Sequence, residues 1–303
     1  MSEELKPVYQ KPFLPYVEQI DLLKGRGLSF KNEEQAIKIL ERVSYYRLGC
    51  YWHMFLDGRQ NKVFKENSSF ESAFEIYKFD MNLRKIIIAE IEKIEVAFRS
   101  KMAHVLSLSN GSFWLEEKSL FSKSSEHKSL VLKVKEEIKR SDESLIASFK
   151  KEYSNDIPPT FMLLEITSFG TLSKLYKNLK SSKEKQEIAS FFGLFDKAFE
   201  SWLYSLVYVR NVCAHYARLW NRKMRIIPVH PSTHKNQWLN NRQIPNNRIY
   251  FILSMLIYLL NIINPKHSFK QKLNALFLKY PIIDKTAMGF PANWQKEPLW
   301  VSV

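Results

Sequence analysis

One long helical repeat of apolar residues constrains this chain more than any other feature of its sequence. Between Phe70 and Leu108, apolar side chains recur at steps of three and four residues. The stripe consists of Leu83, Ile87, Ile91, Ile94, Phe98 and Met102. That period matches the α-helix, with about 3.6 residues per turn, and places these side chains on one face. Further helices must cover such a face, so the sequence predicts an all-α fold.

Helical patterns fill most of the remaining chain. We expect a short helix closed by Gly25 and Gly27, and a helix capped by Asn32 that continues through SYYRLGCYWHMF. Further helices are predicted as a solvated pair over 123–154 and from Pro159 to Leu179, where Gly170 indicates a bend or a close helix approach. Others are predicted over 182–193, 196–220, 247–263 and 267–279. Only residues 225–229 hint at a strand.

The charge and the cysteines bear on partners and compartment. The formal net charge is +15, so the surface attracts polyanions, with nucleic acid ahead of an anionic membrane face. Cys50 and Cys213 form no disulfide framework, and the charged N-terminus has no signal-peptide pattern, so we expect a reduced, cytoplasmic location. The apolar run 249–263 is shorter than the roughly 20 residues that span a bilayer. It predicts a buried core helix and no membrane segment.

The residues that carry chemistry lie in one segment, VRNVCAHYARLWNRKMR, over 209–225. RNA supplies its own nucleophile, the 2′-hydroxyl, so an enzyme need only move protons and stabilise charge. His215 can exchange protons near neutral pH as a general acid or base. Arg210 presents a planar fork that suits phosphate oxygens and can stabilise a phosphorane-like transition state, with Asn211 orienting one of these groups. This scheme requires no metal or cofactor.

Four further cations follow the histidine, and we expect them to hold RNA through phosphate contacts: Arg218, Arg222, Lys223 and Arg225. Arg210 and His215 are five positions apart, about 140° around an ideal helix, so they do not share one narrow face. A second copy of the helix could bring two Arg–His pairs into one cleft, which favours a homodimer. A surface arginine and a core histidine with a backbone partner remain the structural alternative.

The segment RNVCAH resembles the Arg-x4–6-His signature of HEPN ribonucleases, and Arg210, Asn211 and His215 match it position by position. Other segments resemble the Abi-like abortive-infection family: KPFLPYVEQIDLLKGRGL, ILERVSYYRLGCYW, DMNLRKIIIAEIEKIEVAFRS, PPTFMLLEITSFGTLSKLYKNL and MGFPANWQKEPLW. The similarity spans nearly the whole chain and is weakest at about 118–156.

This resemblance implies a HEPN-type helical bundle with additional N- and C-terminal helices. It implies one Abi-like domain over 1–303, with an N-terminal helical part (1–65), a core (66–225) and C-terminal helices (226–303). It also implies a dimeric, metal-independent endoribonuclease that leaves 2′,3′-cyclic phosphates. The expected role is anti-phage abortive infection or the toxin of a toxin–antitoxin pair, with a small RNA or a protein as the neutralising partner. The alternatives are a non-catalytic RNA-binding module that sequesters an RNA or ribosomal factor, and a structural partner protein.

Other polar residues favour structural interpretations. Glu165, beside an apolar stripe, could orient Arg210 or His215, but a salt bridge explains it as well. The pair His230 and His234 could hold zinc, but we interpret both as loop histidines. The spacing of Glu95 and Arg99 predicts an ion pair on an exposed helix face.

Overall fold

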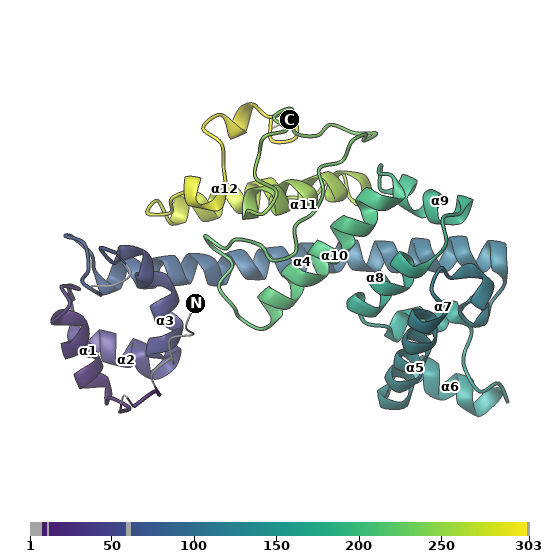
Figure 1. The fold of residues 1–303 in the computed structure, drawn as a ribbon, viewed down its shortest axis with the longest axis horizontal. Coiled ribbons are helices and arrows are strands. Elements are labelled where there is room, and N and C mark those ends of the chain that lie inside the picture. The colour runs from purple at the N-terminus through teal and green to yellow at the C-terminus, as the bar shows by residue number, and fades with distance from the viewer. Residues whose placement is uncertain (1–7, 11, 59–61, 302–303) are drawn as a thin grey trace, which may run out of the picture. The chain divides into compact units, whose positions relative to one another are not determined.

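The computed structural model describes residues 8–10, 12–58 and 62–301. Within these residues the chain is all-α, which confirms the predicted fold class; extended pairing is limited to isolated bridges such as Phe121 with Leu179. Figure 1 shows the helices in chain order: α1 (Tyr16–Lys24), α2 (Glu33–Val43), α3 (Tyr45–Trp52), α4 (Phe70–Asn110), α5 (Ser124–Arg140), α6 (Ser144–Glu152), α7 (Thr160–Ile166), α8 (Phe169–Asn178), α9 (Lys183–Phe191), α10 (Asp196–Ala214), α11 (Ile249–Ile263) and α12 (Phe269–Lys279).

Short 3₁₀ turns join several of these helices: η1 (His53–Phe55), η2 (Trp114–Glu116), η3 (Lys118–Leu120), η4 (Thr286–Met288) and η5 (Trp294–Lys296). The contacts divide the chain into two compact units. The first unit comprises residues 1–81 with 279–283, and the second comprises 82–278 with 284–303. The boundary falls inside α4, so this helix contributes to both units. The single domain expected over 1–303, with its internal subdivision, stays a prediction.

In the first unit, side-chain caps set the limits of the helices. The side chain of Asn32 accepts a hydrogen bond from the Gln35 amide, as expected for the start of α2. The expected continuation beyond α2 is wrong, because the chain breaks at Ser44, which has a φ of 65°. The Ser44 hydroxyl then accepts from the Arg47 amide and starts α3 as a separate helix. A serine oxygen of this kind competes with helix continuation.

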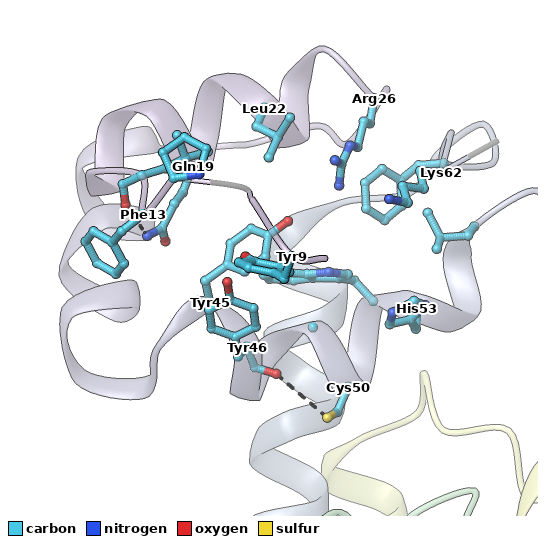
Figure 2. A pocket seen from close by; sticks show the side chains of 16 residues that line it. Tyr9, Phe13, Gln19, Leu22, Arg26, Tyr45, Tyr46, Cys50, His53 and Lys62 are labelled. Carbon is cyan, nitrogen blue, oxygen red and sulfur yellow. Dashed lines mark hydrogen bonds between the residues drawn. The ribbon is translucent and has the colours of Figure 1, made fainter. Parts of the chain in front are cut away.

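Packing around α3 leaves a hollow in the first unit with a volume of about 630 Å³ (Figure 2). Aromatic side chains supply much of its lining, among them Tyr9, Tyr45, Tyr46 and Trp52. The ring of Tyr45 meets Trp52 edge to face at 5.2 Å and Tyr46 at 5.6 Å. Beneath this cluster, Tyr51 donates a hydrogen bond of 2.6 Å to the buried carboxylate of Asp80 on α4.

The predicted apolar stripe of α4 forms the core of the second unit. All six of its side chains, Leu83, Ile87, Ile91, Ile94, Phe98 and Met102, have no exposed surface. The ring of Phe98 lies 5.7 Å from that of Tyr176 on α8 and 5.6 Å from that of Phe199 on α10. These edge-to-face contacts tie three helices together, and they fix α10 relative to α4.

The helix that we expected to run from Pro159 to Leu179 is two helices, α7 and α8. The break lies at Thr167 and Ser168, earlier than the bend expected at Gly170. The Ser168 hydroxyl accepts from the Thr171 amide and caps α8. Gly170 marks a close helix approach: a Cβ there would lie 3.7 Å from Val207 of α10.

The predicted helix over 196–220 starts at Asp196 but ends at Ala214. Tyr216 adopts a left-handed conformation with a φ of 56°. Its amide donates to the carbonyl of Cys213, and the Ala217 amide donates to that of Val212. These two bonds form a Schellman C-cap, which glycine usually supplies. Since the sequence has tyrosine at this position, it gave no signal for the end of the helix.

The C-terminal part packs as expected. Helix α11 is buried from Ile249 to Leu260, and no helix in the described part of the chain is both long and apolar enough to cross a membrane. The aromatic tail docks on it: the indole of Trp300 donates to Ser254 and stacks at 5.2 Å on Tyr250. Residues 225–229, the one strand-like run in the sequence, form no strand.

Candidate functional site

Helix α10 presents the predicted catalytic residues at its C-terminal end. Its buried face carries Phe199, Trp202, Leu203, Leu206 and Val209, which recur at helical steps and anchor it in the core. Arg210 lies half-buried, whereas Asn211 and His215 are exposed. The Nη1 of Arg210 donates a hydrogen bond of 3.3 Å to the Oδ1 of Asn211. His215 is the C-cap residue of the helix, and its amide donates to the Asn211 carbonyl.

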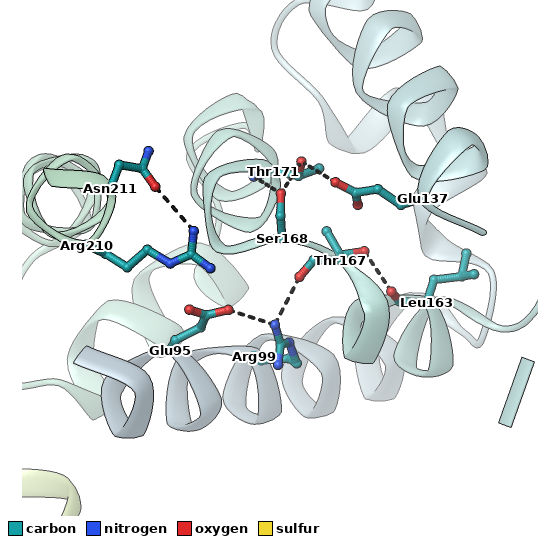
Figure 3. Close-up of polar contacts among 9 residues, drawn as sticks. All are labelled: Glu95, Arg99, Glu137, Leu163, Thr167, Ser168, Thr171, Arg210 and Asn211. Carbon is teal, nitrogen blue, oxygen red and sulfur yellow. Dashed lines mark hydrogen bonds and ion pairs between the residues drawn. The ribbon is translucent and has the colours of Figure 1, made fainter. Parts of the chain in front are cut away.

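Arg210 extends toward a carboxylate on α4, that of Glu95 (Figure 3). Glu95 accepts a hydrogen bond of 2.9 Å from Arg99, which also donates to the carbonyl of Thr167 over 3.0 Å. The Thr167 carbonyl lies at the break between α7 and α8, where the regular bonding of a helix is interrupted. Its hydrogen bond must therefore come from a donor outside the helix, and Arg99 supplies it. The break therefore fixes Arg99, and Arg99 in turn fixes Glu95.

Burial sets the electrostatics of this group. Only 15% of the Glu95 side chain and 13% of the Arg99 side chain are exposed, in contrast to the exposed pair that the spacing suggested. Burial raises the pKa of Glu95 above its ordinary value, although the guanidinium groups of Arg99 and Arg210 oppose the shift. The ionised form of Glu95 is consequently stabilised by its ion pair with Arg99 and by the nearby charge of Arg210.

The basic segment after α10 folds back along that helix. The guanidinium of Arg222 donates to the Tyr208 hydroxyl at 3.0 Å and to the Arg218 carbonyl at 2.7 Å. Further along, the Val229 amide donates to the hydroxyl of Ser201, and the Val229 carbonyl accepts from Trp202. These contacts join the segment to successively earlier turns of α10, so its cations lie beside the helix that carries Arg210.

The four predicted RNA-binding cations differ in their surroundings. Lys223 and Arg225 are exposed, whereas Arg218 and Arg222 are half-buried. Arg222 braces the segment on Tyr208, with its guanidinium 6.0 Å from the centre of that ring. Exposed cations can contact phosphate without reorganisation, so Lys223 and Arg225 are the better placed for a polyanion.

Two other candidates lie apart from these residues. Glu165 is exposed and lines a shallow hollow with His104 and Ser107 between α4 and α7, and neither Arg210 nor His215 lines that hollow. The ring of His230 bonds to the Ile244 carbonyl and that of His234 to the Asn236 carbonyl. Within the described residues, no three His, Cys, Asp or Glu side chains are grouped to hold a metal ion.

Sequence reasoning missed the acid that faces Arg210. It weighed Glu165 for that role and treated Glu95 as a structural residue, either paired with Arg99 or one of a pair of acids with Glu92. Glu95 directly follows Ile94, a member of the buried stripe, and a carboxylate beside such a stripe is drawn partly into the protein. The position of Glu95 next to Ile94 was therefore a signal of its burial. The sequence did not reveal that α10 supplies Arg210 as a second arginine near this carboxylate.

Comparison with known proteins assigns this all-α chain to a family. A profile of the family described as Abi-like protein matches residues 38–221, well over half of the chain and including α10. The chain therefore belongs to the Abi-like protein family. That membership is consistent with a role in abortive infection and with an enzymatic activity. Searches of the curated proteins and of the solved structures gave no match.

Proposed function

We propose that this protein is a metal-independent endoribonuclease of the HEPN type, acting in anti-phage abortive infection or as the toxin of a toxin–antitoxin pair. One observation carries the proposal. Near the C-terminal end of α10, Arg210 is oriented by a hydrogen bond to Asn211 and faces Glu95, and His215 follows as the exposed C-cap residue of the same helix. An imidazole and an oriented guanidinium are the two groups that cleavage by the 2′-hydroxyl needs.

The chemistry follows from these groups. The 2′-oxygen attacks the adjacent phosphorus while its proton passes to a base, and the bond from phosphorus to the 5′-oxygen breaks as that oxygen takes up a proton. His215 serves as the general base or the general acid. Arg210 stabilises the additional negative charge of the five-coordinate phosphorus. The products are a 2′,3′-cyclic phosphate and a 5′-hydroxyl.

Glu95 and Asn211 hold Arg210 in place in this scheme. An arginine side chain has several rotatable bonds, and fixing them before the substrate binds avoids an entropic cost in the transition state. The Glu95 carboxylate accepts from Arg99, which the Thr167 carbonyl holds in turn, so it provides a rigid support. Glu95 is therefore a positioning residue and takes no part in proton transfer.

A homodimer would complete the site. Lys197, Tyr204 and Asn211 are exposed on α10 at intervals of seven residues, and His215 follows four residues later, whereas Ser201 and Tyr208 between them bind the basic segment of the same chain. The seven-residue interval suits pairing with a second helix along the strip that the basic segment leaves open. A two-fold axis on this face would bring two Arg210–His215 pairs to one RNA strand, one histidine as base and the other as acid. In cells, a neutralising small RNA or protein would restrain the enzyme.

Incubation of purified protein with end-labelled RNA in EDTA tests the proposal. The wild type should release fragments with 2′,3′-cyclic phosphate ends, and Arg210→Ala and His215→Ala should release none above background. Retention of RNA by all three proteins without cleavage would contradict the nuclease and support an RNA-binding module. An absence of both cleavage and RNA retention would favour a structural partner protein.

A further inference from the structure

The hollow beside α3 in the first unit has the size of a small-molecule site. Its volume of about 630 Å³ lies within the range of about 300–1,000 Å³ that is common for ligand pockets. None of the catalytic candidates lines it, so the proposed reaction leaves it without a role. Its walls come from Tyr9 and residues 12–14, from α1 and the turn after it, from α3, and from His53, Leu56, Lys62 and Phe64.

Accessible aromatic rings gather around this hollow. Tyr46 is 73% exposed and Tyr9 is 71% exposed, and both line it together with the half-buried Tyr45 (Figure 2). Large rings left in water around one depression are typical of an interaction site rather than of a core. Tyr9 comes from the N-terminal segment and the other two rings from α3, so a planar ligand meets rings from two segments of the unit.

The charges that line the hollow have one sign. Arg26 and Lys62 lie at its rim with His53 nearby, and none of the lining residues, all within the described part of the chain, is Asp or Glu. A ligand that suits this lining has a planar ring and a negative charge. Each nucleotide of RNA has both, and unpaired bases bind commonly to aromatic platforms beside Arg and Lys.

We infer that this hollow binds an unpaired nucleotide of single-stranded RNA, with its base against the tyrosine rings and its phosphate at Arg26 and Lys62. This inference deepens the proposed function and rests on it, since RNA is taken as the substrate. It assigns substrate capture to the first unit and cleavage to the second. The hollow would favour single-stranded over duplex RNA, because only unpaired bases expose both faces for stacking.

Binding of a short fluorescein-labelled single-stranded RNA, followed by anisotropy, tests the inference. The parent protein carries His215→Ala so that the RNA stays intact. Tyr46→Ala should weaken binding about tenfold with an unchanged salt dependence, because it removes stacking. Arg26→Gln should reduce the slope of log K against log salt by about 1. Lys38→Gln, an exposed lysine of the same unit that does not line the hollow, serves as the matched control.

Cys50 provides a direct probe of occupancy. This exposed cysteine lines the hollow, and the other cysteine, Cys213, is buried in α10. The same RNA should slow alkylation of Cys50 by iodoacetamide at least severalfold in the parent and much less in Tyr46→Ala. Because Cys213 is buried, it should stay unmodified while the protein is folded, so it serves as an internal reference.

Three outcomes would overturn the inference: equal RNA affinity of parent, Tyr46→Ala and Arg26→Gln; alkylation of Cys50 at the same rate with saturating RNA; or equal affinity for duplex RNA. Protection of Cys50 by a proline-rich peptide and not by RNA would also overturn it. Failure of the proposed function has a different signature. If the wild type cleaves no RNA but its RNA binding depends on Tyr46 and Arg26, the nuclease proposal is contradicted and the inferred binding site is supported.

Discussion

Arg99 donates a hydrogen bond of 2.9 Å to the carboxylate of Glu95, and Arg210 of another helix faces the same carboxylate. Glu95 thus connects the core of the second unit to the proposed active site. Burial raises the pKa of this carboxyl group, so the protein holds a charge there at a cost to its stability. A residue that is unfavourable for folding and yet faces a candidate catalytic arginine suggests a functional constraint.

The first prediction concerns Glu95→Gln. The pKa of Glu95 is raised above 4.5, so the protonated acid stabilises the fold fully below that value, and this contribution is lost as pH rises through the raised pKa. Glutamine stays neutral and can still accept from Arg99. At pH 8 we expect thermal unfolding of Glu95→Gln at or above the temperature of the wild type, with the two converging near pH 4.

The same substitution should lower kcat for RNA cleavage by about tenfold to a hundredfold with little change in KM, because a misplaced group can cost about 10² in rate. Glu92→Gln, an exposed glutamate on the same helix, is the control and should leave both parameters unchanged. A loss of stability at pH 8 together with full activity would show that Glu95 is a structural residue and not a positioning one.

A second prediction concerns the basic segment that follows α10. Lys223→Gln and Arg225→Gln should each reduce the salt dependence of RNA binding, lowering the slope of log K against log salt by about 1, because each removes one phosphate contact. Filter binding over a range of salt concentrations measures the slope. Lys151→Gln, an exposed lysine on α6, should leave it unchanged. Equal slopes for all four proteins would exclude these two cations from the RNA interface.

A third prediction compares two glycines with similar backbones. Gly289 and Gly111 have φ values of 88° and 80°. A Cβ at Gly289 would lie 2.5 Å from the Cβ of Arg248, whereas at Gly111 it would meet nothing within 4 Å. Gly111→Ala should cost about 1–2 kcal/mol from the backbone alone. Gly289→Ala should cost about 2–5 kcal/mol, since overpacking adds to that strain.

Urea denaturation measures both free energies of unfolding. Gly289 lies in the tail that docks on α11, so its substitution should also expose the Trp300 ring and shift the tryptophan fluorescence to longer wavelengths. Equal losses of stability in the two variants would show that the contact between Gly289 and Arg248 is looser than the structure indicates.

Apolar spacing predicted most of the fold, because burial follows the period of the helix. The stripe from Leu83 to Met102 is buried throughout, and Asn32 caps α2 as its side-chain chemistry requires. The errors fell where a single residue ends a helix without a strong signal. Ser44 and Tyr216 end helices in positive-φ conformations that their side chains disfavour, and Ser168 caps a new helix after the break at the end of α7.

The candidate site was only partly accessible to sequence reasoning. Arg210, Asn211 and His215 are local to one helix, so their spacing was visible. The approach of Arg210 to Glu95 joins residues far apart in the chain, and it depends on how α4 and α10 pack around Phe98 and Phe199. The path of the basic segment along α10 depends likewise on tertiary hydrogen bonds, such as that between Arg222 and Tyr208.

The central claim is that Arg210 and His215 act as one unit on RNA. Single-turnover cleavage rates of wild type, Arg210→Ala, His215→Ala and the double variant test it most directly. Residues that act together are strongly non-additive, so each single substitution should lower the rate at least about 10²-fold and the double variant should be no slower than the worse single one. The account would be contradicted if His215→Ala cleaved RNA at the wild-type rate. It would also be contradicted if the fold-losses in rate of the two single variants multiplied in the double variant.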